Sequence, residues 1–137
     1  MSRRGLRWVL DAAIVASVLL ALVLTLDPRL PQDETVVAAD ASSLSFGILP
    51  LAAHGLIFAG LGMVVALRLT LLPPEAQRRP TLIALTAIAV FAAADEQAQR
   101  LVDGHGPELV DWVADVTGAS IGLATTRLTQ WVRPSEA

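Results

Sequence analysis

Long apolar runs separated by short polar stretches dominate the pattern of this chain. The first run, "WVLDAAIVASVLLALVLTL", covers residues 8–26 and contains one charged residue, Asp11. The second covers about residues 48–72 and ends at Pro73 and Pro74, which do not continue a helix. A bilayer core requires about 20 mostly apolar residues per helix, so each run predicts a membrane-spanning helix.

Two further helices are expected in the second half of the chain, although charged residues interrupt both. The run "TLIALTAIAVFAAA" predicts a helix over about 81–101, and a fourth helix is expected over about 108–130, beginning next to Pro107. Residues 27–47 are polar and lack periodicity, which predicts an irregular external loop. The expected fold is therefore all-α: one polytopic membrane domain, residues 1–137, with a bundle of four transmembrane helices.

Composition supports the membrane class and excludes several kinds of chemistry. Of the 137 residues, 54% are hydrophobic and 17% charged, which is more apolar than an ordinary soluble domain. The chain has no Cys, so disulfides, thiolate zinc sites and cysteine nucleophiles are excluded. The net charge of −3 argues against nucleic acid as a partner. The start "MSRRGLR" also resembles a secretory signal peptide, but the apolar run that follows exceeds a normal signal-peptide core.

The arginines predict the orientation of the bundle. With the N-terminus inside, Arg29 and Arg100 are the basic residues that fall outside. The basic residues on the inner side are then Arg3, Arg4, Arg7, Arg68, Arg78, Arg79, Arg127 and Arg133. Cytoplasmic segments of membrane proteins carry an excess of positive charge, so both termini are expected in the cytoplasm of a multi-pass protein of the plasma membrane.

Ionisable residues recur at similar depth in three of the expected helices. At 1.5 Å per residue, Asp115 lies about 12 Å into the fourth helix, His54 about 9 Å into the second, and Glu96 about 8 Å from the outer end of the third. Each would cost about 2.5 to 3.5 kcal/mol facing lipid, so they are expected to line a polar cleft open to the outside. The candidate binding residues are His54, Glu96, Gln99, His105, Asp111 and Asp115.

Small residues on the same helices predict close packing beside this cleft. Gly118 and Gly122 form a small-xxx-small surface on the stripe that carries the acids of the fourth helix. Gly55 and Gly62 give the second helix a comparable face. Such a face could also serve a homo-oligomer.

Plainer roles are open for several of the polar residues. Glu96 and Arg100 have the i,i+4 spacing of an interfacial salt bridge, and His54 could be a hydrogen-bonded packing residue. Asp11 is expected to pair with Arg7, one turn earlier. The residues that flank the expected turn are interpreted as solvated turn residues or as residues of the membrane interface: Asp95, Asp103 and Glu108.

The residues of this region also follow a fixed order. Behind an upstream helix with His54 and Phe58 come Glu96-x-x-Gln99, Asp111, Asp115, Gly118 and Gly122. This order, over about residues 48–122, resembles the VanZ-like family of small bacterial membrane proteins. The resemblance implies a helical protein of the bacterial cell envelope, linked to resistance to the glycopeptide teicoplanin.

The chain departs from the family pattern at chemically important positions. His105 stands where the family usually has Arg, and Asp115 stands where it has Asn. Upstream, Pro50 and Leu51 replace the usual Asp-Lys, and Phe58 takes a position often held by Tyr. The first two changes move the site away from anion binding, toward cations or toward a pH-sensitive pair.

Three functions are consistent with these residues. The first is a non-enzymatic envelope protein whose outward cleft binds a lipid-linked or peptide-like cell-wall component, or the glycopeptide that targets it. The second is a metal-assisted membrane hydrolase acting on lipid headgroups, because carboxylates and His suit a divalent cation. No metal-specific motif such as His-Glu-x-x-His occurs, so no metal ligand is assigned. The third is a scaffold subunit in the lipid bilayer whose polar residues only join its own helices.

Overall fold

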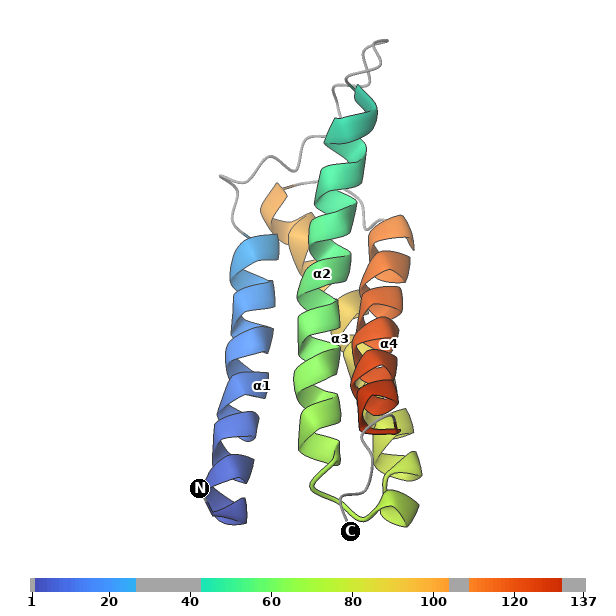
Figure 1. The fold of residues 1–137 in the computed structure, drawn as a ribbon. Helices are drawn as coiled ribbons and strands as arrows, with labels where there is room; N and C mark the ends of the chain where they lie inside the picture. Colours follow the sequence, from blue (N-terminus) through green and yellow to red (C-terminus); the bar gives the residue numbers. More distant parts are fainter. Residues whose placement is uncertain (1, 27–42, 104–108, 132–137) are drawn as a thin grey trace.

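The computed structural model describes residues 2–26, 43–103 and 109–131. Its elements are α1 (Arg3–Thr25), α2 (Ser43–Leu69), the short 3₁₀ helix η1 (Pro74–Ala76), α3 (Arg78–Asp103) and α4 (Leu109–Trp131). These described parts form four long helices and contain no strand, which confirms the expected all-α class (Figure 1).

The helix boundaries differ from the predicted ones for local reasons. α1 begins at Arg3 rather than at residue 8, because the Oγ of Ser2 accepts a hydrogen bond of 3.1 Å from the Gly5 amide and caps the helix. α2 begins at Ser43, so residues 43–47, expected in the external loop, are helical. The rest of that loop lies outside the described residues.

The proline positions explain the connection between α2 and α3. α2 ends at Leu69, and the following turn leads to Pro73 and into η1. Pro80 lies inside the first turn of α3, where the missing amide hydrogen has no partner to lose. The connection is therefore short, and α2 and α3 run in opposite directions (Figure 1).

The four helices form an elongated bundle. The N-terminus and the C-terminal end of α4 lie at the same end of the bundle as the α2–α3 connection (Figure 1). The most extensive contact joins α2 and α4; α1 packs mainly on α2, and α3 mainly on α4. The α2–α4 pair is therefore the centre of the fold.

Large apolar side chains cover the outside of the bundle. Exposed examples on α1 and α3 include Trp8, Leu19, Ile83 and Val90. The buried core is made mostly of smaller apolar residues, and its largest member, Phe58, packs on Phe91 with ring centroids 5.8 Å apart. An apolar surface of this extent is suited to contact with lipid rather than with water.

Within the part of the chain that the structure describes, three helical segments are long and apolar enough to cross a membrane: Arg3–Thr25, Leu51–Leu69 and Arg78–Gln99. The fourth helix, α4, has a comparable length of 23 residues but carries Asp111, Asp115 and Arg127. α3 carries more charged residues, but they lie toward its two ends and leave an apolar segment between them, whereas the charges of α4 interrupt it.

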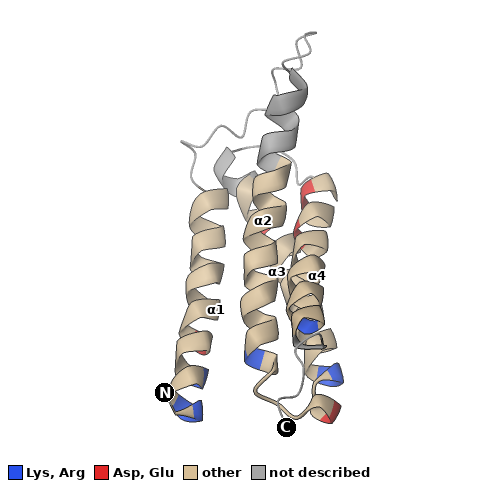
Figure 2. Cartoon of the chain, in the orientation of Figure 1, with Lys and Arg blue, Asp and Glu red and all other residues tan. Residues whose placement is uncertain are grey.

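Charge is distributed unevenly along the bundle. The arginines whose side chains the structure describes gather toward one end, on the start of α1, the end of α2, the start of α3 and the second half of α4 (Figure 2). They are Arg3, Arg4, Arg7, Arg68, Arg78, Arg79 and Arg127. We call this the arginine end. The first turn of α4, with Asp111, lies toward the opposite end.

Candidate functional site

An imidazole and a carboxylate meet between α2 and α4. The Nδ1 of His54 lies 3.2 Å from the Oδ1 of Asp115. The Asp115 side chain is fully buried, and the His54 side chain is 14% exposed. Both residues lie in the first half of their helices, away from the arginine end, where α2 ends.

Glycine brings these two helices close enough for the contact. A Cβ added to Gly118 would overlap the carbonyl oxygen of Gly55, so the two backbones touch at this point. A Cβ on Gly55 would lie 3.7 Å from the Ala114 carbonyl oxygen, which is an ordinary contact. The closeness therefore depends on Gly118. It places His54, next to Gly55 in sequence, opposite Asp115, one turn before Gly118.

The close approach continues along the same interface. A Cβ on Gly122 would overlap the Ala59 carbonyl oxygen, and a Cβ on Gly62 would overlap that of Ala119. Small residues facing each other in this way let two helix backbones pack directly. The α2–α4 interface thus holds His54 and Asp115 in fixed positions relative to each other.

Glu96 adds a third ionisable group, from α3. Its side chain is buried, with 4% exposure. One nitrogen or oxygen atom from each of His54, Glu96 and Asp115 lies within 4.8 Å of the other two. The Nε2 of Gln99, one turn further on, lies 3.5 Å from the Glu96 Oε1.

Asp111 completes the group that the structure brings together. It lies in the first turn of α4, half-buried, one turn before Asp115. The i,i+4 spacing places Asp111 on the same face of α4 as Asp115. His105, the remaining predicted member of the cleft, lies outside the described residues. We call His54, Glu96, Gln99, Asp111 and Asp115 the polar cluster.

The interpretation of Asp95 as a solvated residue is wrong. Asp95 is only 1% exposed, and its Oδ1 accepts a hydrogen bond of 2.9 Å from the hydroxyl of Thr25 on α1. α3 continues to Asp103, two turns beyond Asp95, so Asp95 lies inside the bundle rather than at a turn. The spacing Ile88, Ala92, Asp95 places it on the buried face of the helix. That 4,3 spacing is the sequence signal for its burial.

The structure pairs Asp11 with Arg68 instead of with the expected Arg7. The Nε of Arg68 on α2 donates a hydrogen bond of 2.7 Å to the Asp11 Oδ1, so the contact joins two helices instead of two turns of one. Both side chains are partly exposed. The contact lies at the arginine end and attaches α1 to α2 there.

Two buried carboxylate oxygens have no hydrogen-bond partner among the described residues. They are the Oδ2 atoms of Asp95 and Asp115. An unsatisfied buried polar atom costs about 1 to 3 kcal/mol, and more when it carries charge. The burial of these two oxygens therefore lowers the free energy of unfolding of the bundle.

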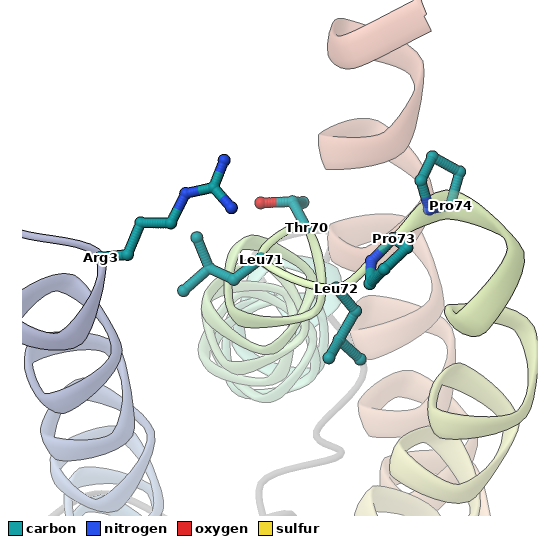
Figure 3. A pocket seen from close by; sticks show the side chains of 6 residues that line it. All are labelled: Arg3, Thr70, Leu71, Leu72, Pro73 and Pro74. Atoms are coloured by element: carbon teal, nitrogen blue, oxygen red, sulfur yellow. The ribbon is translucent and has the colours of Figure 1, made fainter.

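A hollow of about 320 Å³ lies elsewhere, at the arginine end (Figure 3). It is lined by Arg3, Thr70, Leu71, Leu72, Pro73 and Pro74. None of these residues belongs to the polar cluster. The hollow and the candidate chemistry are therefore separate features of the molecule.

A scan against models of known protein families finds no match, and searches of curated proteins and of solved structures find none either.

Proposed function

We propose that this chain is a four-span protein of the bacterial plasma membrane and a divergent VanZ-like relative, with both termini in the cytoplasm. The fixed spacing from Glu96 to Gly122 supports the family, and the arginine end supports the orientation. α4 is long enough to span at about 1.5 Å per residue. Asp115 and Thr126 of α4 are buried in the bundle, which removes the main cost of placing them in lipid.

The function we propose is binding of a lipid-linked or peptide-like cell-wall component, or of the glycopeptide that targets it, at the polar cluster. The observation that carries it is the convergence of His54, Glu96 and Asp115 from three helices within 4.8 Å. Ionisable groups inside a membrane bundle are expensive and usually mark a binding site or pathway. With the arginine end inside, the polar cluster lies in the outer half, where cell-wall components are found.

The test is a tolerance assay in cells. Glu96→Ala and Asp111→Ala should abolish glycopeptide tolerance while leaving the amount of protein in the membrane unchanged. Glu75→Ala is the matched control, because Glu75 is an exposed acid in η1 at the other end of the bundle. Unchanged tolerance in both cluster variants would refute the proposal.

A second candidate function is a metal-assisted hydrolase acting on lipid headgroups. The same three residues favour it, because an imidazole and two carboxylates are usual ligands of a catalytic metal. Purified protein in lipid vesicles should then release headgroups in the presence of a divalent ion, and Glu96→Gln should abolish release. Equal release by Glu96→Gln and the wild-type protein would exclude this activity.

A further inference from the structure

We propose that His54, Glu96 and Asp115 together bind one first-row divalent metal ion, for which Zn²⁺ is the best match. The group contains one imidazole and two carboxylates, each of which can offer one ligand atom. Zinc sites of the catalytic type use three protein ligands of these kinds and keep a fourth position for water or substrate. Two carboxylates also balance the charge of a divalent ion, leaving the buried site neutral.

The distances fit such a site after a small contraction. Bonds of about 2.0 to 2.1 Å to a tetrahedral ion place any two ligand atoms about 3.4 Å apart. The His54 Nδ1 and Asp115 Oδ1 are already 3.2 Å apart. The three ligand atoms lie within 4.8 Å of one another, so Glu96 has to move inward by on the order of 1 Å, which rotation of its side chain provides.

An independent observation is the second oxygen of Asp115. Its Oδ2 is buried and has no hydrogen-bond partner among the described residues, on a side chain that is 0% exposed. A carboxylate in this position needs a proton or a cation to offset the loss of water. A metal ion supplies that cation and can bind Glu96 at the same time.

The ligands come from three helices, so the ion has a structural consequence. His54 and Asp115 lie on the α2–α4 pair, whereas Glu96 lies on α3. The indole nitrogen of Trp112 on α4 donates a hydrogen bond of 3.0 Å to the Ala89 carbonyl oxygen of α3, which already joins these two helices nearby. A metal ion would add a second, stronger connection and fix the position of Glu96.

The inference concerns the same residues as the proposed function but does not require the cell-wall ligand. Metal binding is measured on purified protein, whereas tolerance is measured in cells. Either proposal can therefore fail without the other. If both hold, the fourth coordination position is available to a phosphate or carboxylate oxygen of the ligand.

The experiment uses the full chain in detergent, treated with a chelator and then exposed to Zn²⁺. The wild-type protein should retain about one zinc ion per chain after desalting. Its midpoint of thermal unfolding should rise with zinc concentration, because an ion that binds only the folded state stabilises it. His54→Gln, Glu96→Gln and Asp115→Asn should each weaken zinc binding by about tenfold or more.

Two variants control for zinc bound elsewhere. Asp11→Asn removes a partly exposed carboxylate of α1 at the arginine end, and Glu75→Gln removes an exposed one in η1. Both should bind zinc as the wild-type protein does. The inference is overturned if the wild-type protein retains no zinc, which would mean that protons neutralise the cluster, or if the three ligand variants bind zinc as well as the controls do.

A variant that gains a new metal signal keeps the test informative even if the variants that lose zinc binding fail to fold. His54→Cys places a thiolate in the site, and the native chain has no Cys. Cadmium should then produce a thiolate-to-metal absorption band in His54→Cys that Glu96→Gln, added to the same protein, weakens. A band of equal strength with and without Glu96 would show that residue 54 binds cadmium alone, and would overturn the shared site.

Discussion

The Thr25 hydroxyl on α1 lies 2.9 Å from the Asp95 Oδ1 on α3, although the two residues are 70 positions apart in sequence. The other oxygen of Asp95 has no hydrogen-bond partner among the described residues. Thr25→Val should therefore lower the free energy of unfolding by about 1 to 3 kcal/mol, because it removes the hydrogen bond that joins this buried carboxylate to α1. Reversible unfolding in mixed micelles measures the change.

Thr129→Val is the matched control for this substitution. Thr129 on α4 is exposed and bonds only to a carbonyl oxygen of its own helix. It should change stability by only a few tenths of a kcal/mol, as expected for a surface position. Equal effects of Thr25→Val and Thr129→Val would show that the contact between α1 and α3 contributes no stability.

Gly118→Ala should weaken the contact between α2 and α4. The added methyl would overlap the Gly55 carbonyl oxygen, and backbone cannot move aside as a flexible side chain can. Overpacking of this kind costs about 1 to 3 kcal/mol. Thermal unfolding, followed by tryptophan fluorescence, should show a lower midpoint.

Gly60→Ala provides the comparison on α2 itself. A Cβ at Gly60 meets nothing within 4 Å, so the new methyl has space. Replacing Gly by Ala inside a helix then stabilises it by up to about 1 kcal/mol. A lower midpoint in both variants would mean that any glycine replacement is harmful here, and that close backbone packing at Gly118 is not the cause.

Asp115→Asn separates a binding site from a scaffold. Asn has the same shape as Asp and can still hydrogen-bond the His54 ring, while the buried charge is removed. The helix content and membrane abundance of the variant should therefore equal those of the wild-type protein. Tolerance should be lost if the charge takes part in binding. Full tolerance in Asp115→Asn would instead favour the scaffold, in which the polar residues only join helices.

Single cysteines decide whether α4 crosses the membrane. The native chain has no Cys, so a label reports only the introduced position. With four spans, His105→Cys should react with an impermeant reagent in intact cells, whereas Glu75→Cys and Ser135→Cys should react only after permeabilisation. With three spans, position 135 would share the side of position 105. Labelling of Ser135→Cys in intact cells would therefore contradict the fourth span.

Much of the helical framework was accessible from the sequence. Apolar runs long enough for a bilayer predicted α1 to α3, and Pro73 with Pro74 indicated where α2 stops. The start of α2 was predicted late. Its first turns, from Ser43, follow a polar stretch, and hydropathy does not distinguish a polar helix turn from a loop.

The candidate site was predicted only in part, because the sequence gives the depth of a residue along its helix but not the packing of the helices. Depth along each helix placed His54, Glu96 and Asp115 at one level, and the structure brings them together. Depth along a helix does not show which way a side chain faces around the helix axis. It also does not show which residues of other helices that side chain meets. Asp95 was therefore assigned to solvent, and Thr25, a polar residue at the end of an apolar run, was not considered. Both depend on how α1 and α3 pack, which only the three-dimensional arrangement gives.

The backbone contact at Gly118 joins α2 and α4 more firmly than side-chain contacts join α1 to the rest of the bundle. α2 and α4 meet through main-chain atoms and cannot separate without losing that contact. The polar contacts that attach α1 to its neighbours include those of Asp11 with Arg68 and of Thr25 with Asp95, which can break and re-form by rotation of side chains. Any opening that admits a ligand should therefore be a swing of α1 against a stationary pair, leaving the His54 to Asp115 distance unaltered.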